Sequence, residues 1–251
     1  TNLKTLDVQK CKLQSLDVTK NEVLTSLNCS DNAFTAIDLS KNTLLATLIG
    51  DNLALTKINL STNTKLAKYS FTGNPDLTSI RVCPDFTMDN CLFTSAGNNP
   101  SLSIFNTAGN TFFYVGQYST TFGSGGVVFK ITDGGQNGKM VSVTETNLAW
   151  STEKITTEAK NQDDGMANMN TIKALNPDLS KYPAFKWCAD YGTDWYLPTL
   201  NELKTIYGLK STINSVLSAN DFTSLEGYYW SSIENSSNNS SDMSFSSGTT
   251  Y

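Results

Sequence analysis

Residues 24–44, LTSLNCSDNAFTAIDLSKNTL, contain one apolar frame twice, as Leu24-Leu27-Cys29 and as Phe34-Ile37-Leu39. The frame, L-x-x-L-x-[VLC], recurs in eight consecutive copies between Leu3 and Val82, at steps of 10 or 11 residues. Two copies make a repeating unit of about 21 residues, and a fixed period of this length is typical of solenoid proteins. Each turn of a solenoid buries its apolar row only against neighbouring turns, so the ends of the stack need caps.

A second pattern runs through the same repeats. An asparagine stands eight residues after the first apolar position of five frames, where its amide can bond the backbone of adjacent turns in a ladder. These residues are Asn21, Asn32, Asn42, Asn63 and Asn74. At Gly50-Asp51-Asn52 the frame slips, and we expect a local irregularity there. The pattern predicts a solenoid from Leu3 to about Asp85 with the frame leucines buried.

The unit Leu24–Leu44 resembles the leucine-rich-repeat superfamily, in its short bacterial class with a 21-residue unit. This resemblance implies a right-handed β-solenoid of about four turns with short strands on both sides. Its outward positions are small and polar, which is compatible with a binding surface or with a spacer that presents another domain. They hold no aromatic cluster of the kind that dominates binding energy, which favours the spacer. These positions include Lys4, Thr5, Asp7, Ser15, Asp17, Ser26 and Asp38.

Composition excludes several classes of function. The chain of 251 residues has a net charge of -5 and no run of Lys or Arg, which argues against nucleic-acid binding. No window of 18 apolar residues is present, so no membrane span is predicted. Histidine is absent, which excludes Ser-His-Asp and Cys-His catalysis. No C-x-x-C pair occurs among the five cysteines, so no zinc site, other metal site or cofactor is predicted.

Two further features concern processing and redox state. The chain begins within a repeat at Thr1, and we expect that an N-terminal targeting segment was removed before it. Cys83 and Cys91 flank a short loop. They form either a disulfide in an oxidising compartment or two thiols.

The repeat ends after Val82, where turn-forming residues replace the frame. We predict three segments: the solenoid over 1–86, a capping or junction segment over 87–114, and a second domain over 115–251. In that domain a strand is predicted over 125–131, a glycine-rich turn over 133–138 and a returning strand over 139–143. Helices are predicted over 166–175, capped by Asp164, over 183–191, after Thr199 and over 211–218, and a strand over 228–232.

The stretch 194–203 joins an apolar segment to a helix. Thr199 and Glu202 form a T-x-x-E capping box, in which each side chain binds a backbone N–H at the helix start. This favours Glu202 as a cap over a catalytic carboxylate. Pro198 precedes the cap, where it breaks no helical hydrogen bond. We expect the extended segment Trp195-Tyr196-Leu197 to supply a buried aromatic anchor.

Several motifs of the second domain occur in one order. They are Gly-Gly-Val-Val-Phe, Gly-Gln-Asn-Gly, Trp150-Ser151, Trp195-Tyr196-Leu197-Pro198 with Glu202-Leu203, and Trp230-Ser231-Ser232 with Glu234. Together they resemble the family of the C-terminal domain of the Legionella collagen-like adhesin, which is C-type-lectin-like. The resemblance covers 115–251 and implies a mixed α+β fold with two helices and a long loop region over a central sheet.

The chain departs from that family in two ways. Family members end with a further strand containing Val-Arg-x-Val-Arg, which is not found before Tyr251, so a core strand is expected to be missing. The adhesin's sulfated glycans suit a basic surface, whereas this chain is acidic. The fold group also includes the formylglycine-generating enzymes, but their catalytic cysteine pair has no counterpart here. Repeats followed by this domain are similar to surface proteins of gut Bacteroides.

The resemblance therefore implies a non-enzymatic protein of the bacterial cell surface that binds a glycan or a host or bacterial surface protein. A structural display module and an enzyme on the same fold are the alternatives. The candidate ligand residues lie in a polar stretch expected to be an exposed loop: Glu234, Asn235, Asn238, Asn239 and Asp242. Trp195 and Trp230 are either a sugar platform or core residues, and their motifs favour the core. The tripeptides Glu-Pro-Asn and Trp-Asn-Asp, typical of calcium-dependent sugar lectins, are absent.

Overall fold

The chain forms two compact units in a computed structural model that describes residues 2–83, 102–106, 111–120, 125–154, 156–236 and 239–251. The first unit comprises Thr1–Tyr118 and Val127–Met140, and the second comprises Ser119–Gly126 and Val141–Tyr251. Most of the hairpin of β10 (Gly126–Thr132) and β11 (Asn137–Ser142) therefore belongs to the first unit, whereas the sequence places it after a boundary near Val115.

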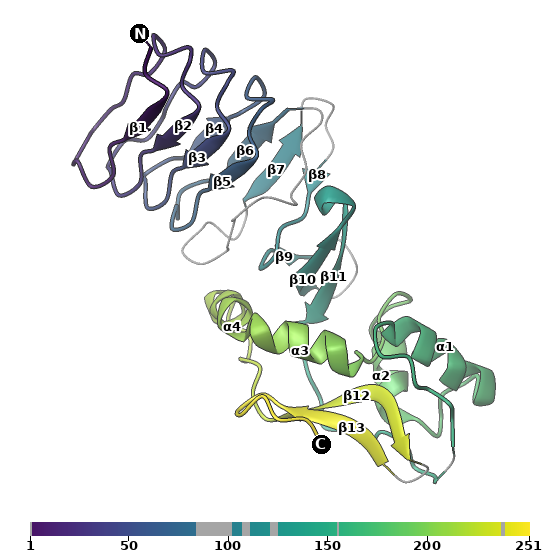
Figure 1. The fold of residues 1–251 in the computed structure, drawn as a ribbon. Coiled ribbons are helices and arrows are strands. Elements are labelled where there is room, and N and C mark those ends of the chain that lie inside the picture. The colour runs from purple at the N-terminus through teal and green to yellow at the C-terminus, as the bar shows by residue number, and fades with distance from the viewer. Residues whose placement is uncertain (1, 84–101, 107–110, 121–124, 155, 237–238) are drawn as a thin grey trace. The chain divides into compact units, whose positions relative to one another are not determined.

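One face of the solenoid is a parallel sheet with one strand from each of four turns (Figure 1). Its strands are β1 (Thr5–Asp7), β2 (Ser26–Asn28), β3 (Thr47–Ile49) and β5 (Lys68–Ser70), in the order β1-β2-β3-β5. Leu27 pairs with Leu6 on one side and with Leu48 on the other. Paired positions are thus one repeat unit apart, and the predicted β-solenoid of about four turns is confirmed.

The opposite face carries a second sheet in the order β4-β6-β7-β8. It consists of β4 (Lys57–Asn59), β6 (Ser79–Val82), β7 (Ser103–Asn106) and β8 (Thr111–Phe112), and only β8 runs antiparallel to its neighbour. The frames at 13–18 and 34–39 contain no strand. The expectation of strands on both sides is therefore wrong for the first two turns. β7 and β8 come from the segment 87–114 and extend this sheet.

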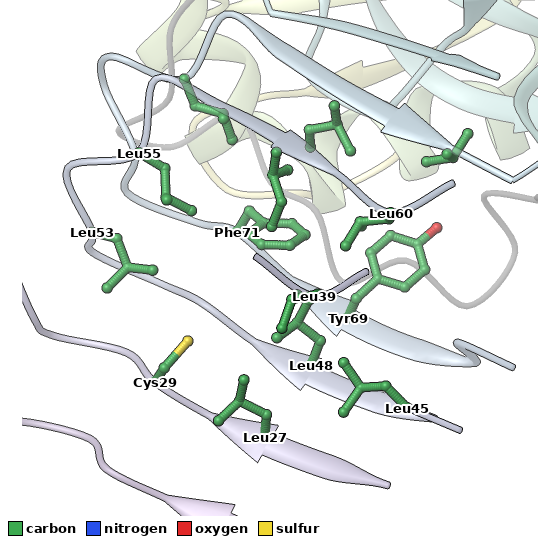
Figure 2. Close-up of a cluster of buried hydrophobic side chains, with 14 of the residues drawn as sticks. Leu27, Cys29, Leu39, Leu45, Leu48, Leu53, Leu55, Leu60, Tyr69 and Phe71 are labelled. Carbon is green, nitrogen blue, oxygen red and sulfur yellow. The ribbon is translucent and has the colours of Figure 1, made fainter. Parts of the chain in front are cut away.

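The core of the first unit lies between the two faces of the solenoid. Figure 2 shows Leu27, Leu48 and Leu39 among the buried side chains. From Leu24 onward the frame residues are buried except Ile37 and Leu66, which are partly buried and pack against the core. Leu3 is 39% exposed and belongs to a turn with a neighbour on one side only. The prediction that the frame leucines are buried is therefore wrong for the first turn, because a repeat is covered only by the turns next to it. Leu13, Leu16 and Leu66 are partly buried.

The asparagine ladder is present and forms two columns. In one column, the side-chain Nδ2 of Asn42 donates to the backbone oxygens of Val18 and Asn21, and that of Asn63 donates to those of Leu39 and Asn42. In the other column, Asn32 and Asn74 make the same kind of bond to carbonyls of their own turn and of the preceding one; these carbonyls are Val8, Cys29 and Ser30 for Asn32, and Gly50, Phe71 and Thr72 for Asn74. The ladder supplies hydrogen-bond donors to corner carbonyls that have no partner in a neighbouring strand.

The irregularity expected at Gly50-Asp51-Asn52 is absent from the backbone. The corner residues Lys10, Asp31, Asn52 and Gly73 all have positive φ, and each follows the last by one repeat unit. The change is in side chains, since Leu53 takes the place of an asparagine and is buried. A Cβ on Gly50 would meet the Phe71 ring at 3.1 Å and Leu53 at 3.4 Å, so glycine makes room for both.

The second unit is an α+β structure with four helices in the described residues, where the resemblance implies two. They are α1 (Gly165–Leu175), α2 (Pro183–Tyr191), α3 (Leu200–Gly208) and α4 (Lys210–Ala219). Asp164 caps α1 through a 3.1 Å bond to its side chain from the Ala167 N–H. The predicted helix positions are confirmed to within a few residues.

A hairpin of β12 (Tyr228–Ser236) and β13 (Asn239–Ser244) completes the second unit. Tyr251 exchanges two backbone hydrogen bonds with Asp242, of 3.2 and 3.0 Å, so residues 249–251 lie antiparallel along β13. The remaining sheet has the order β11-β10-β9, where β9 is Tyr118–Ser119. The short 3₁₀ helix Asp133–Gly135 occupies the predicted glycine-rich turn between β10 and β11.

Candidate functional site

The stretch predicted to be an exposed loop consists mostly of strands. Glu234 and Asn235 lie in β12, and Asn239 and Asp242 lie in β13, while Asn238 lies outside the described residues. The expectation of a long loop is therefore wrong. The alternation of small polar residues did not reveal the strands, since Ser and Asn are usually depleted from them.

Glu234 is buried, with 5% of its surface exposed, and is corrected from an exposed ligand residue to an internal one. Its Oε2 accepts hydrogen bonds from the backbone N–H groups of Thr157 and Glu158, at 2.8 and 2.9 Å, and from the Thr157 hydroxyl at 3.1 Å. Its Oε1 is buried without a partner among the described residues. The carboxylate thus holds the segment 157–159 against β12.

Thr199 and Glu202 make the predicted capping box at the start of α3. The Thr199 hydroxyl accepts from the Glu202 N–H at 3.1 Å, and Glu202 Oε2 accepts from the Thr199 N–H at 2.9 Å. The other oxygen of Glu202 accepts from the Tyr196 hydroxyl at 2.8 Å. Burial, followed by the Glu202 charge, raises the pKa of Tyr196. These contacts support the reading of Glu202 as a helix cap.

The aromatic anchor of the second unit is not the Trp195 segment. Trp150, Tyr182 and Phe185 are buried and meet edge to face, with ring centroids 5.1–6.1 Å apart. Trp195, Tyr196, Leu197 and Pro198 are only half-buried. Tyr196 lies against Gly165 at the start of α1, where a Cβ would approach its ring to 2.4 Å. The segment therefore covers the helices rather than filling the core.

Trp230 is exposed, at 37%, so its assignment to the core is also corrected. It lies directly opposite Asp242 on β13, and Asp242 in turn lies opposite Tyr251. Residues opposite one another in a sheet point to the same face. Because Asp242 exchanges its backbone hydrogen bonds with Tyr251, the Trp230–Asp242 pair is of the non-hydrogen-bonded type, in which side chains come closest.

Tyr228 joins this row because it precedes Trp230 by two residues in the same strand. Tyr228 and Tyr251 are 66% and 62% exposed, and their ring centroids lie 6.0 Å apart. The face therefore presents three aromatic side chains around one carboxylate, and we call these four residues the aromatic–acid face. The sequence alone signals only the run Tyr228-Tyr229-Trp230; Tyr251 was missed.

Two contacts hold the aromatic–acid face in place. The Trp230 indole N–H donates to the Leu148 carbonyl at 3.0 Å, which fixes the ring. On the opposite side of the hairpin Tyr229 packs on Phe245, with centroids 4.6 Å apart, and Met243 and Phe245 are buried. One side of the hairpin is thus bound to the core while the other shows its rings to solvent.

Asp242 is the charged group of this face. Its Oδ1 has no exposed surface and no hydrogen-bond partner among the described residues. Burial raises the pKa of Asp242, since loss of water disfavours the charged form. Among the described residues its Oδ1 therefore lacks the donor that usually accompanies a partly buried charge.

The cysteines, metal-ligating side chains and helices of the described residues bear on other functional classes. Burial raises the pKa of the Cys29 and Cys188 thiols to about 12, so neither is a thiolate near neutral pH. Cys83 is buried with a free thiol, while Cys91 lies outside the described residues. Among the described residues no cluster of three metal-ligating side chains occurs, and no helix has the length and apolar character of a membrane span.

The outer corner of the solenoid carries polar side chains bonded to one another between turns. Asp31 accepts from the Gln9 and Asn52 amides, at 2.8 and 2.9 Å. These bonds lower the pKa of Asp31. Because the groups satisfy each other, this surface offers few free donors or acceptors.

Comparisons with known proteins add little to this picture. No protein-family model and no curated protein matches the chain. Among solved structures there is a likeness to the functional domain of InlJ from Listeria monocytogenes, a structure described as including a cysteine ladder. The match is 26% identical over 37% of this chain and 22% of that one, with a TM-score of 0.25. The solenoid assignment therefore rests on the register of the strands, not on this likeness.

Proposed function

We propose that this chain is a non-enzymatic binding protein of the bacterial cell surface, in which a leucine-rich-repeat solenoid presents a C-type-lectin-like domain. The ligand is a glycan, held at the aromatic–acid face of the β12–β13 hairpin. The proposal keeps Asp242 from the predicted ligand residues and moves the rest of the site from the loop to the strands. Surface exposure on a bacterium of the Bacteroides type is part of the same proposal and rests on sequence resemblance.

The observation that carries the proposal is the arrangement of Tyr228, Trp230 and Tyr251 around Asp242. Sugars present apolar C–H faces and hydroxyl edges, which match flat aromatic rings beside a hydrogen-bond acceptor. Specific sites combine apolar walls with a few fixed polar groups. The bond from Trp230 to the Leu148 carbonyl supports preorganisation, because one ring is oriented before any ligand arrives.

The solenoid is assigned the role of a spacer. Its outward strand positions are small or charged, as in Thr5, Ser26 and Lys57, and the described repeats show no exposed aromatic cluster. A purely structural display module would share this solenoid. It would not explain three exposed aromatic side chains beside a carboxylate whose Oδ1 has no hydrogen-bond partner among the described residues.

A glycan array probed with the intact chain, with and without calcium, tests the proposal. Selective binding that Trp230→Ala reduces about five- to tenfold is expected, since ring contacts contribute roughly 1–1.5 kcal/mol. Leu175→Ala is the control, because Leu175 is 55% exposed in the same unit but lies on α1. An array without selective binding, or binding indifferent to Trp230→Ala, would refute this site.

A further inference from the structure

Asp242 stands out on the aromatic–acid face because no Lys or Arg among the described residues forms an ion pair with it. The described ion pairs are Lys160–Glu158, Lys181–Glu153 and Lys186–Asp190, none of which includes it. A carboxylate in a folded protein usually recovers lost hydration from a cation or from N–H donors. Here Oδ1 is covered and has no donor, so part of the hydration lost on folding is not replaced.

The neighbouring groups add to this imbalance. The flanking residues on both sides, Trp230 and Tyr251, are aromatic, and the faces of their rings carry partial negative charge. Other charged groups near the start of the hairpin are Glu226, whose N–H bonds the Tyr229 hydroxyl, and Glu145, whose carboxylate accepts from that hydroxyl. Lys210 is bound to the Phe245 carbonyl at 2.7 Å.

We infer that the aromatic–acid face selects glycans with a protonated amine, such as unacetylated amino sugars, over neutral glycans. The inference rests on the proposed function and names the ligand class of that site. Oδ1 is covered, so an ammonium group would form its charge-assisted hydrogen bond with the other oxygen of the half-buried Asp242 carboxylate, and such a bond is stronger than one from a neutral hydroxyl. It would also lie against the ring faces of Tyr228, Trp230 or Tyr251 in a cation–π contact.

A pair of oligosaccharides isolates this effect. The trimer of glucosamine and the trimer of N-acetylglucosamine share the same ring and linkage and differ in the charge on nitrogen. At about pH 6 the free amines are protonated, since this lies below the pKa of ordinary amines. Calorimetric titration of the intact chain should show the glucosamine trimer bound about tenfold more tightly, as a desolvated cation–π contact with a charged acceptor suggests.

Two variants separate a local charge from the net charge of the chain. Asp242→Asn keeps the shape of the side chain and should reduce the preference for the glucosamine trimer to about twofold or less. Asp221→Asn removes the same single charge from an exposed turn elsewhere in the second unit and should leave the preference unchanged. Thermal unfolding of both variants checks that the fold is retained.

The outcomes distinguish the inference from the proposed function. Equal binding of both trimers, or a preference that survives Asp242→Asn, would overturn selection by charge while leaving glycan binding in place. A preference lost equally in Asp242→Asn and Asp221→Asn would overturn it too, because long-range attraction to an acidic protein would then suffice. If neither trimer binds and the glycan array is also blank, both the inference and the proposed function fail.

Discussion

Asn74→Ala tests what holds the corners of the solenoid together. The Asn74 side chain is fully buried, and its Nδ2 donates to the Gly50, Phe71 and Thr72 carbonyls at 3.0, 2.9 and 3.3 Å. Its Oδ1 accepts from the Leu53 N–H at 3.2 Å. The Thr72 carbonyl keeps a second donor, the Asn52 N–H. Alanine therefore leaves three backbone groups without these partners.

The expected cost follows from those three groups. A buried donor or acceptor that loses its partner costs about 1–3 kcal/mol, so even the lower value gives a loss of about 3 kcal/mol for the solenoid. Asn59→Ala is the matched control, because Asn59 is exposed and accepts one bond, from the Ser61 N–H. The control should change stability by less than about 1 kcal/mol.

The assay must report on the solenoid alone. Trp150, Trp187, Trp195 and Trp230 are the four tryptophans, and all belong to the second unit, so tryptophan fluorescence follows that unit. Hydrogen exchange of the β3 and β5 amides follows the solenoid instead. A loss of about 3 kcal/mol should speed their exchange by roughly 100-fold.

A second variant makes the reasoning refutable. Asn74→Leu fills the side-chain volume that alanine leaves empty but makes none of the hydrogen bonds, so it should be nearly as unstable as Asn74→Ala. If Asn74→Leu exchanged as slowly as the unsubstituted chain, the ladder would act through packing. Exchange less than about fivefold faster in Asn74→Ala would also refute the account.

Three further predictions concern other links in the structure. Leu27→Ala removes a fully buried core side chain and should cost the solenoid about 2–5 kcal/mol by hydrogen exchange, whereas a loss below about 1 kcal/mol would contradict the repeat frame. Glu202→Ala removes bonds to the Thr199 N–H and the Tyr196 hydroxyl and should cost the second unit about 1–3 kcal/mol in urea unfolding followed by tryptophan fluorescence. Unchanged unfolding would show that the capping box is dispensable. The raised pKa of Asp242 means that the folded chain binds this proton more tightly than the unfolded chain. Its contribution to stability should therefore increase as pH falls through the raised pKa toward 3.8, and Asp242→Asn should remove that increase.

The repeat could be predicted because solenoid packing is local. Each frame residue, such as Leu27, meets its equivalents Leu6 and Leu48 one unit away in each direction, so the period in the sequence is also the spacing in the structure. The helices were predicted for a similar reason, since Asp164 and Thr199 act within their own first turns. Local signals of this kind need no knowledge of distant contacts.

The misjudged repeat at Gly50-Asp51-Asn52 shows where that locality ends. Leu53 lacks an asparagine's bonds, yet the carbonyls within its reach are served from the adjacent turns. Asn32 bonds the Cys29 carbonyl and Asn74 bonds the Gly50 carbonyl, while the Asp31 N–H bonds the Asp51 carbonyl. The ladder therefore tolerates the loss of one asparagine when the turns on both sides keep theirs. Inspection of each repeat unit by itself does not reveal this tolerance.

The proposed binding face differs from the predicted one because the exposed side of a strand depends on register. In β12 the residues Tyr228 and Trp230 share a face, but a register shift follows between Trp230 and Glu234. After Trp230, the residues Ser231, Ser232 and Glu234 are all buried. The Asn168 side chain on α1 donates to the Ser232 hydroxyl at 2.9 Å. The local sequence predicts neither this register shift nor the packing of α1 against it. The aromatic residues of β12 all precede this shift, so a ligand at the proposed face would meet Trp230 and Asp242 together while Glu234 stays inside.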